Sequence, residues 1–179
     1  MDIACLFALG HRVGDKLVLR NETVAVAESS AGGLISAALL ARAGASAYYL
    51  GGAVLYTRRA GRLLTTLTAD DTAGKRSSSL PFGQLLARHQ RTRFRASWGL
   101  AETGAAGPAG NTYGDPAGHS CLAVDGPVLR ARVLRTGQAE RHPNMVAFAM
   151  AALELLDEAL DAAPAPGAAK AQAAPGAPA

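Results

Sequence analysis

The pattern of apolar and polar positions predicts helices alternating with strands along most of the chain. Apolar side chains recur at helical spacing over residues 3–20, although Gly10 and Gly14 each cost about 1 kcal/mol relative to alanine inside a helix. The run from Thr23 to Ala27 is continuously apolar and β-rich, which is typical of a buried strand. Residues 31–43 follow it with the pattern of a helix.

The remaining elements follow from apolar periodicity and from the residues that interrupt it. An extended pattern over 48–57 predicts a strand that ends at Tyr56 and has a bulge at Gly51-Gly52. It is followed by a helical turn over 58–64, a polar loop over 65–79 and a helix over 81–93 that buries Leu85 and Leu86. The last predicted elements are a strand over 97–102, a hairpin over 119–136 and a helix over 141–160. This order predicts a three-layer α/β/α sandwich, built as a single domain on a mostly parallel mixed sheet. We expect the domain to occupy residues 1–161, and the Ala/Pro/Gly-rich residues 162–179 to form a disordered tail.

Composition narrows the class of protein. A chain of 179 residues with 49% hydrophobic content suffices for one domain with a substantial core. Cys5 and Cys121 lie too far apart for C-x-x-C spacing, so we expect no disulfide framework and no metal site. The first residues lack the basic start of a signal peptide, and no apolar run reaches the ~20 residues of a membrane span. We therefore expect a cytoplasmic protein that needs no cofactor.

The net charge of +4 raises the possibility of a nucleic-acid partner. Much of the positive charge lies at the end of the predicted helix over 81–93 and in the turn over 58–62. Cations complement the dipole at a helix C-terminus, and no aromatic residues alternate with these arginines as base-stacking platforms would require. The pattern favours a solvated basic face over nucleic-acid binding.

The segment TVAVAESSAGG, residues 23–33, holds the most informative chemistry. A strand that ends at a small polar turn before a helix leaves free backbone N–H groups, which suit an anion or a developing oxyanion. Ser29 is a candidate nucleophile, with backbone N–H groups near Ser30, Gly32 and Gly33 as candidate oxyanion donors. The alternative is that Ser29 or Ser30 only caps the helix.

Three polar residues end the three predicted parallel strands: Ser29, Tyr56 and Thr103. Ligands of open α/β sheets bind at the carboxyl ends of strands, so we expect these residues to converge on one pocket. The alternative role for Tyr56 is that of a packed aromatic residue. The Gly-rich loop that follows Thr103 can cradle an anion with backbone N–H groups, but it matches no established phosphate motif, and neither does Gly74-Lys75-Arg76-Ser77.

Three further ionisable residues have two possible roles each. His119 follows the Gly-rich loop and is either a proton acceptor near the pocket or a structural residue. Glu28 and Glu102 precede the two loops at matched positions. Each glutamate either orders its turn by accepting backbone N–H bonds or binds a substrate hydroxyl.

Four ordered motifs resemble the C-terminal domain of the competence/damage-inducible CinA proteins, a family that includes nicotinamide-nucleotide amidohydrolases. The motifs are AESSAGGLISAAL at 27–39, GASAYYLGGAVLYT at 44–57, ETGAAGP at 102–108 and DPAGHSCLAV at 115–124. The resemblance extends over residues 1 to about 160. It implies a homodimer whose pocket hydrolyses the carboxamide of nicotinamide mononucleotide to the acid and ammonia, without a metal.

The resemblance also implies roles for individual residues. Ser29 falls on the family's nucleophile, Tyr56 on its pocket tyrosine, and Thr103, Gly104 and Ala106 in its substrate loop. The other residues expected to bind substrate are Ser30, Gly32, Gly33, Arg59 and Arg62.

Position 61 departs from the family. The family activates its serine with a lysine five residues beyond the tyrosine, where this chain has Gly61. Arg59 and Arg62 flank the gap, but a guanidinium stays protonated and can only bind phosphate or stabilise negative charge. The family lysine of a second segment is also replaced, by Asp115. Two functions follow: an amidohydrolase whose base is relocated to Tyr56 or His119, or a nucleotide-binding member that has lost catalysis.

Overall fold

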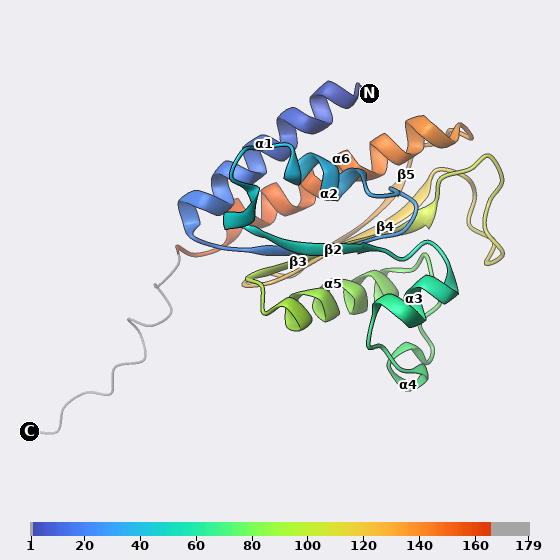
Figure 1. Cartoon of the computed structure of the whole chain (residues 1–179). Coiled ribbons are helices and arrows are strands. Elements are labelled where there is room, and N and C mark those ends of the chain that lie inside the picture. The colour runs from blue at the N-terminus through green and yellow to red at the C-terminus, as the bar shows by residue number, and fades with distance from the viewer. Residues whose placement is uncertain (1, 166–179) are drawn as a thin grey trace, which may run out of the picture.

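The structure, a computed structural model, describes residues 2–165 as a five-stranded sheet with helices on both faces (Figure 1). In spatial order the strands are β2 (Tyr49–Val54), β1 (Val24–Glu28), β3 (Trp98–Ala105), β4 (His119–Asp125) and β5 (Arg130–Arg135). The first three run parallel, while β4 and β5 pair antiparallel as the predicted hairpin. The β1–β2 register shifts beside Leu50, consistent with the bulge expected at Gly51-Gly52.

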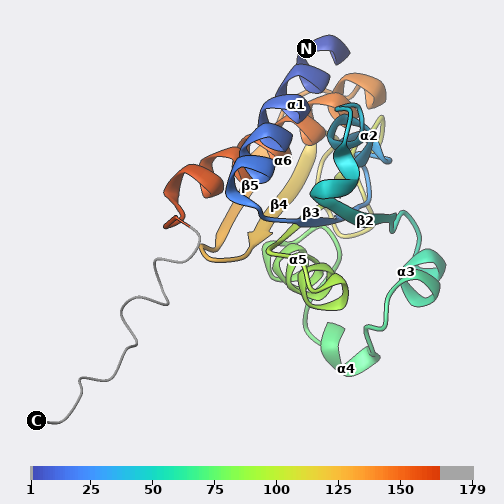
Figure 2. The ribbon, with the colours of Figure 1, turned by 60° about the vertical axis from the view of Figure 1, so that its left-hand side comes forward.

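The helices complete the three predicted layers (Figure 2). On one face lie α1 (Ile3–Arg20), α2 (Leu34–Leu40) and α6 (Arg141–Ala162), with α1 packed on the other two. On the other face lie α5 (Leu80–Phe94), α3 (Arg58–Leu64) and the short α4 (Ala69–Thr72), and a 3-10 turn over Ala45–Ala47 precedes β2. The α/β/α sandwich on a mixed sheet is therefore confirmed.

Most of the buried apolar surface lies between the sheet and the layer of α1, α2 and α6. Trp98, Tyr48 and Phe148 are fully buried there. The α5 side has a smaller cluster of mostly alanines around Leu86. The small core on that side leaves room for a cavity beneath the strand ends.

Gly10 shows why a residue that disfavours helix formation lies inside α1. A Cβ atom at Gly10 would lie 2.3 Å from the carbonyl oxygen of Ala38 in α2, and one at Gly14 would lie 2.6 Å from the Tyr48 hydroxyl. The two helices can therefore cross closely only where α1 has no side chain. Close packing offsets the helix-propensity cost of these glycines.

We expect Gly10→Ala to destabilise the protein by about 1–3 kcal/mol, because the added methyl group forces α1 and α2 apart. Gly61→Ala is the matched control, since a Cβ at that helical position has no atom within 4 Å and alanine favours helix by up to about 1 kcal/mol. Urea unfolding measures both. A Gly10→Ala protein as stable as the wild type would contradict the packing argument.

Element boundaries differ from the predictions where tertiary contacts intervene. The α2 helix begins at Leu34 instead of residue 31, α4 forms inside the predicted loop, and Leu85 is only half-buried. At the C-terminal end, α6 extends to Ala162, Ala163 is buried, and Arg20 donates a hydrogen bond to the Pro164 carbonyl at 2.7 Å. The packed chain thus passes the predicted boundary at 161, and the remainder of the predicted tail, 166–179, lies outside the described residues. Within residues 2–165 no helix has the length and apolarity to cross a membrane.

Candidate active site

A cavity of about 680 Å³ lies at the carboxyl ends of the parallel strands, on the α5 side of the sheet. Ser29, Tyr56 and Thr103 all line it, so the predicted convergence of the three strand ends is observed. The rest of its wall comes from α3, the segment 65–78, the first half of α5 and the loop after β3. This placement follows the general rule for ligand sites in open α/β sheets.

Ser29 comes directly after β1 and is half-buried at the cavity wall. No residue of the described part of the chain forms a hydrogen bond with its Oγ atom, whereas its backbone N–H donates to Glu102 at 3.0 Å. The backbone is therefore held while the hydroxyl remains available to a ligand.

Glu102 holds the Ser29 turn from beneath. Its fully buried carboxylate accepts hydrogen bonds from Ser29 N at 3.0 Å, Ala31 N at 2.8 Å and the hydroxyls of Ser30 and Ser120. A buried carboxylate is tolerated when its oxygens are saturated with donors in this way. Of the two roles considered for Glu102, ordering of the turn is the one observed.

Glu28 plays the matching role at the start of α2. Its carboxylate accepts from Gly33 N, Ile35 N and Ser36 N at 2.8–3.0 Å. Burial raises the pKa of Glu28, while the hydrogen bonds from Ser36 and Ile35 act in the opposite direction. The N-terminus of α2 is thus already occupied by a carboxylate of the protein itself.

This arrangement corrects two predictions about the turn. The cap residue of α2 is Gly33, which makes no side-chain cap bond, so neither Ser29 nor Ser30 caps the helix. Gly33 N donates to Glu28 and Gly32 N to the Ser29 carbonyl, so these N–H groups are not free to hold an oxyanion. The capping prediction failed because the Glu28 carboxylate accepts from the N–H groups at the start of α2. Of the candidate oxyanion donors, this carboxylate engages Gly33 N.

The cavity wall is strongly cationic. It carries Arg58, Arg62, Lys75 and Arg76, and no carboxylate of the described residues lines it. Arg58 donates to the Tyr113 hydroxyl at 3.1 Å, and Arg62 makes no ion pair or hydrogen bond with another described residue. Such a wall favours an anionic ligand.

Tyr56 lies at the exposed edge of the cavity, where Arg141 holds its side chain. The guanidinium donates to the Tyr56 hydroxyl at 2.8 Å and to the Gly107 carbonyl at 2.7 Å, and it lies 5.5 Å from the centre of the tyrosine ring. Arg141, the first residue of α6, therefore joins this helix to the loops after β2 and β3.

His119 lies behind the cavity wall instead of in it. Its Nε2 atom is 3.0 Å from the Ser78 carbonyl and 3.6 Å from Asp115 Oδ1, and only 5% of the residue is exposed. It does not line the cavity, so the structural role is the one observed. The neighbouring thiol is also unsuited to attack, because burial raises the pKa of Cys121 to about 11.

Arg76 lines the cavity and forms an ion pair with Asp115, which lies behind the wall. Both guanidinium Nη atoms donate to the carboxylate, at 2.5 and 2.9 Å, and Asn111 donates to it at 2.9 Å. The Arg76 hydrogen bonds, followed by that from Asn111, lower the pKa of Asp115 to about 2. The Asp115 carboxylate thus ties the segment 65–78 to the loop after β3.

We expect Asp115→Asn to lower the free energy of unfolding by about 1–2 kcal/mol at neutral pH. This is less than the pKa shift alone would give, because solvent screens the ion pair at the half-exposed Arg76. Because the folded-state pKa lies below the unfolded value, this contribution is complete above about pH 5 and is lost as pH falls through about 4 to 2. Urea unfolding of both proteins at several pH values measures it. A stability difference that does not shrink toward pH 2 would contradict the assignment.

The predicted binding residues fall into two groups. Gly104 and Arg62 line the cavity with Ser29, Tyr56 and Thr103, whereas Arg59, Ser30, Gly32, Gly33 and Ala106 do not. Sequence reasoning missed the cavity residues Arg58, Lys75, Arg76, Asn111 and Tyr113, as well as Arg141. The one available signal was the unusual length of the polar segment 65–79, since long connections in compact domains are often functional.

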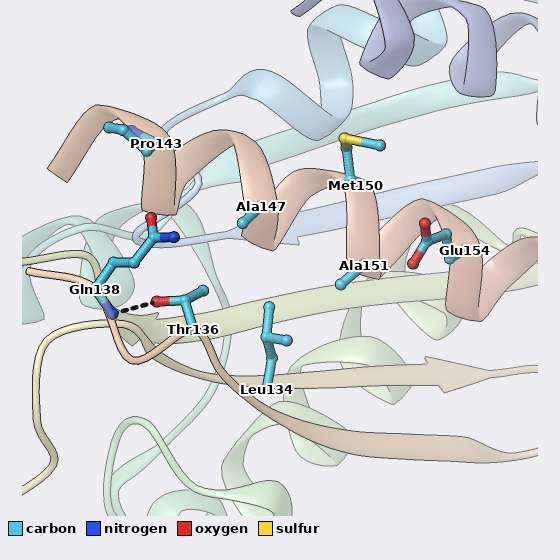
Figure 3. Close-up of a pocket in the computed structure, with 8 residues that line it drawn as sticks. All are labelled: Leu134, Thr136, Gln138, Pro143, Ala147, Met150, Ala151 and Glu154. Atoms are coloured by element: carbon cyan, nitrogen blue, oxygen red, sulfur yellow. Dashed lines mark hydrogen bonds between the residues drawn. The ribbon is translucent and has the colours of Figure 1, made fainter. Parts of the chain in front are cut away.

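A second hollow, of about 250 Å³, lies between β5 and α6 (Figure 3). Its lining mixes apolar side chains with Thr136, Gln138 and Glu154, and Glu154 is its one charged side chain among the described residues. Two of its polar groups already satisfy each other, because Gln138 N donates to Thr136 Oγ1 at 3.2 Å. It offers neither a nucleophile nor a cation, so the larger cavity is the candidate active site.

Comparison with known proteins identifies the family of the chain. A family model described as the CinA C-terminal domain matches residues 7–160. A CinA-like protein of Prochlorococcus marinus (strain MIT 9313) is 38% identical over 120 residues, which cover 67% of this chain and 28% of that protein. A CinA-like protein of Anaeromyxobacter sp. (strain K) is 37% identical over 145 residues, covering 81% and 36%.

Solved structures show the same fold. The competence/damage inducible protein CihA from Agrobacterium tumefaciens has a TM-score of 0.78 at 30% identity, covering 87% of this chain and 95% of that one. The chain spans about a third of the length of these curated relatives, but nearly all of this solved neighbour. The chain belongs to the CinA C-terminal domain family.

Proposed function

We propose that the protein hydrolyses the carboxamide of a nicotinamide mononucleotide-like substrate, with Ser29 as the nucleophile. The observation that carries the proposal is that the unengaged Ser29 hydroxyl shares one cavity with three cationic side chains, Arg58, Arg62 and Lys75, that pair with no carboxylate of the described residues. A fourth, Arg76, is paired with Asp115. A serine without a competing partner suits nucleophilic attack, and a cationic wall suits the phosphate of a nucleotide.

Two further groups have suitable chemistry for the substrate. Thr103 Oγ1 accepts a hydrogen bond from Ser78 N at 3.2 Å, so its own proton is free to be donated to a substrate oxygen. Arg62, which has no partner among the described residues, is available to a phosphate oxygen. These residues support binding and charge stabilisation, but neither can remove the Ser29 proton.

The identity of the base separates this function from its alternative. Gly61 lines the cavity without a side chain, and of the two candidates for a relocated base only Tyr56 lies at the wall. The alternative function is a nucleotide-binding protein without turnover, which the glycine at the family's lysine position favours. Loss of one general base typically costs about 10²–10⁴-fold in rate, so a slow reaction remains compatible with an enzyme.

The proposal is tested by incubating the protein with nicotinamide mononucleotide and, separately, with nicotinamide riboside, which lacks the phosphate. We expect ammonia and the acid product from the mononucleotide, and a much higher KM for the riboside because the cationic wall has no phosphate to bind. Calorimetric binding of the mononucleotide without any product would instead establish the binding function. If the protein neither binds the mononucleotide nor forms product, both functions are refuted.

A further inference from the structure

A chain of hydrogen bonds leads from His119 to the cavity wall through the backbone of Ser78. His119 Nε2 lies 3.0 Å from the Ser78 carbonyl oxygen, and the Ser78 N–H donates to Thr103 Oγ1 at 3.2 Å. Ser78 and Thr103 line the cavity, whereas His119 lies behind them. Each of the three residues is no more than 5% exposed. A buried side chain outside the cavity is thus connected to a hydroxyl in its wall.

The chemistry of the groups fixes the direction of these hydrogen bonds. A carbonyl oxygen can only accept, so His119 Nε2 carries a proton and donates it to Ser78. The other ring nitrogen, Nδ1, is buried and has no hydrogen-bond partner within residues 2–165. His119 therefore acts on the cavity wall through Nε2.

Ser78 has a backbone conformation that its surroundings must hold in place. Its φ angle of 57° lies in the left-handed region, which is unfavourable for a residue with a side chain. Two residues of β4 donate to its carbonyl oxygen, His119 through Nε2 and Cys121 through Sγ at 3.4 Å. A thiol is the weaker donor of the two. We therefore expect the Ser78 backbone to move away from Thr103 when the imidazole is removed.

Thr103 lies next to Ser29 at the ends of two paired strands. In the parallel register of β1 and β3, Ala27 is opposite Ala101, so Ser29 is opposite Thr103 two residues further on. Neighbouring strands are about 5 Å apart, and both side chains line the cavity. Thr103 Oγ1 accepts from Ser78, and no acceptor in the described part of the chain takes its proton. This proton is available to a ligand beside the Ser29 hydroxyl.

We propose that His119 is a positioning residue for the Thr103 hydroxyl, and that this hydroxyl donates to the carboxamide oxygen of the substrate; the inference rests on the proposed function of Ser29. Negative charge develops on that oxygen as Ser29 Oγ attacks the carbonyl carbon. A donor already aimed at the oxygen stabilises the transition state more than the bound substrate. The Ser78 N–H occupies one lone pair of Thr103 Oγ1 and so directs its proton into the cavity, while His119 holds the Ser78 backbone in place.

The first test needs no substrate. Amide hydrogen exchange, followed by NMR, measures how firmly the Ser78 N–H is held, and the Leu100 amide in the middle of β3 reports on global unfolding. We expect Thr103→Val and His119→Leu each to speed exchange at Ser78 at least about tenfold relative to Leu100. His119→Gln should stay near the wild-type rate, because the glutamine amide can donate to the same carbonyl. His11→Leu, at an exposed position of α1, is the matched control with unchanged exchange.

Turnover of nicotinamide mononucleotide provides the second test. Thr103→Val should lower kcat by about 10²–10³-fold, as expected for the loss of one oxyanion donor, with little change in KM. His119→Leu should lower kcat by about ten- to a hundredfold, because it leaves the hydroxyl present but misplaced. Adding His119→Leu to Thr103→Val should cause no further loss, since the group that His119 positions is already absent. If His119 only stabilised the fold, its replacement would lower kcat by the same factor in both backgrounds.

Thermal unfolding checks that each variant is folded. If His119→Leu does not fold, His119→Asn takes its place, because the shorter asparagine puts its amide nitrogen near the Nδ1 position and out of reach of the Ser78 carbonyl. Unchanged Ser78 exchange, a glutamine variant as impaired as the leucine variant, wild-type kcat in Thr103→Val, or losses that multiply in the double variant would each overturn the proposal. If the wild type shows the expected exchange but does not hydrolyse the mononucleotide, the proposed function is refuted while the positioning of Thr103 by His119 stands.

Discussion

Replacing Gly61 with lysine is expected to raise kcat for amide hydrolysis by at least about tenfold, since a well-placed general base contributes about 10²–10⁴-fold. A side chain at position 61 causes no steric clash at its Cβ atom, because this position in α3 has no heavy atom within 4 Å of the Cβ site. It also places the amine at the wall of the cavity that contains Ser29. Steady-state release of ammonia measures the gain.

Gly61→Met is the control for this prediction, because methionine fills similar space without an amine. We expect it to gain stability from helix propensity but no increase in kcat. If Gly61→Lys is no faster than Gly61→Met, position 61 is not a site from which a base can reach the reacting atoms.

Replacing Glu102 with leucine is expected to destabilise the fold by about 3–5 kcal/mol. The substitution removes the acceptor of four hydrogen-bond donors: Ser30 Oγ, Ala31 N and Ser120 Oγ, which are buried, and Ser29 N, which is partly buried. Each buried donor left unpaired costs about 1–3 kcal/mol before relaxation. Urea unfolding measures the loss.

An exposed carboxylate provides the comparison. Glu158 pairs with Arg132 at the surface, so Glu158→Gln should change stability by less than about 0.5 kcal/mol. A Glu102→Leu protein that loses no more than this would show that the turn holds its shape without the carboxylate. Stability and Ser29 placement are linked here, because the same oxygen of Glu102 binds both Ser29 N and Ala31 N.

Local patterns predicted the fold well because strands, helices and the hairpin each have their own periodicity. The convergence of Ser29, Tyr56 and Thr103 also followed from sequence, since parallel strands end at one edge of a sheet. The start of α2 could not be predicted in this way, because the carboxylate of Glu28 accepts the hydrogen bonds from the N–H groups that a capping serine would otherwise accept.

The remaining parts of the site depend on contacts that no local pattern records. Lys75 and Arg76 lie in a polar segment with no regular periodicity, and only the folded chain brings that segment to Ser29. Arg141 lies 85 positions beyond Tyr56 in sequence and yet donates to its hydroxyl. Gly10 disfavours helix formation by its own propensity, and its role follows only from the close contact between α1 and α2. In each case a partner distant in sequence decides the role of the residue.

The most direct test of the account compares hydrolysis of nicotinamide mononucleotide by the wild type and by Ser29→Ala, with calorimetry showing that both bind the nucleotide. We predict that the wild type releases equal amounts of ammonia and acid, and that Ser29→Ala binds the nucleotide but loses at least about 10³-fold in rate, as expected when a nucleophile is removed. Product formation at the same rate in both proteins would contradict the central claim that Ser29 attacks the amide.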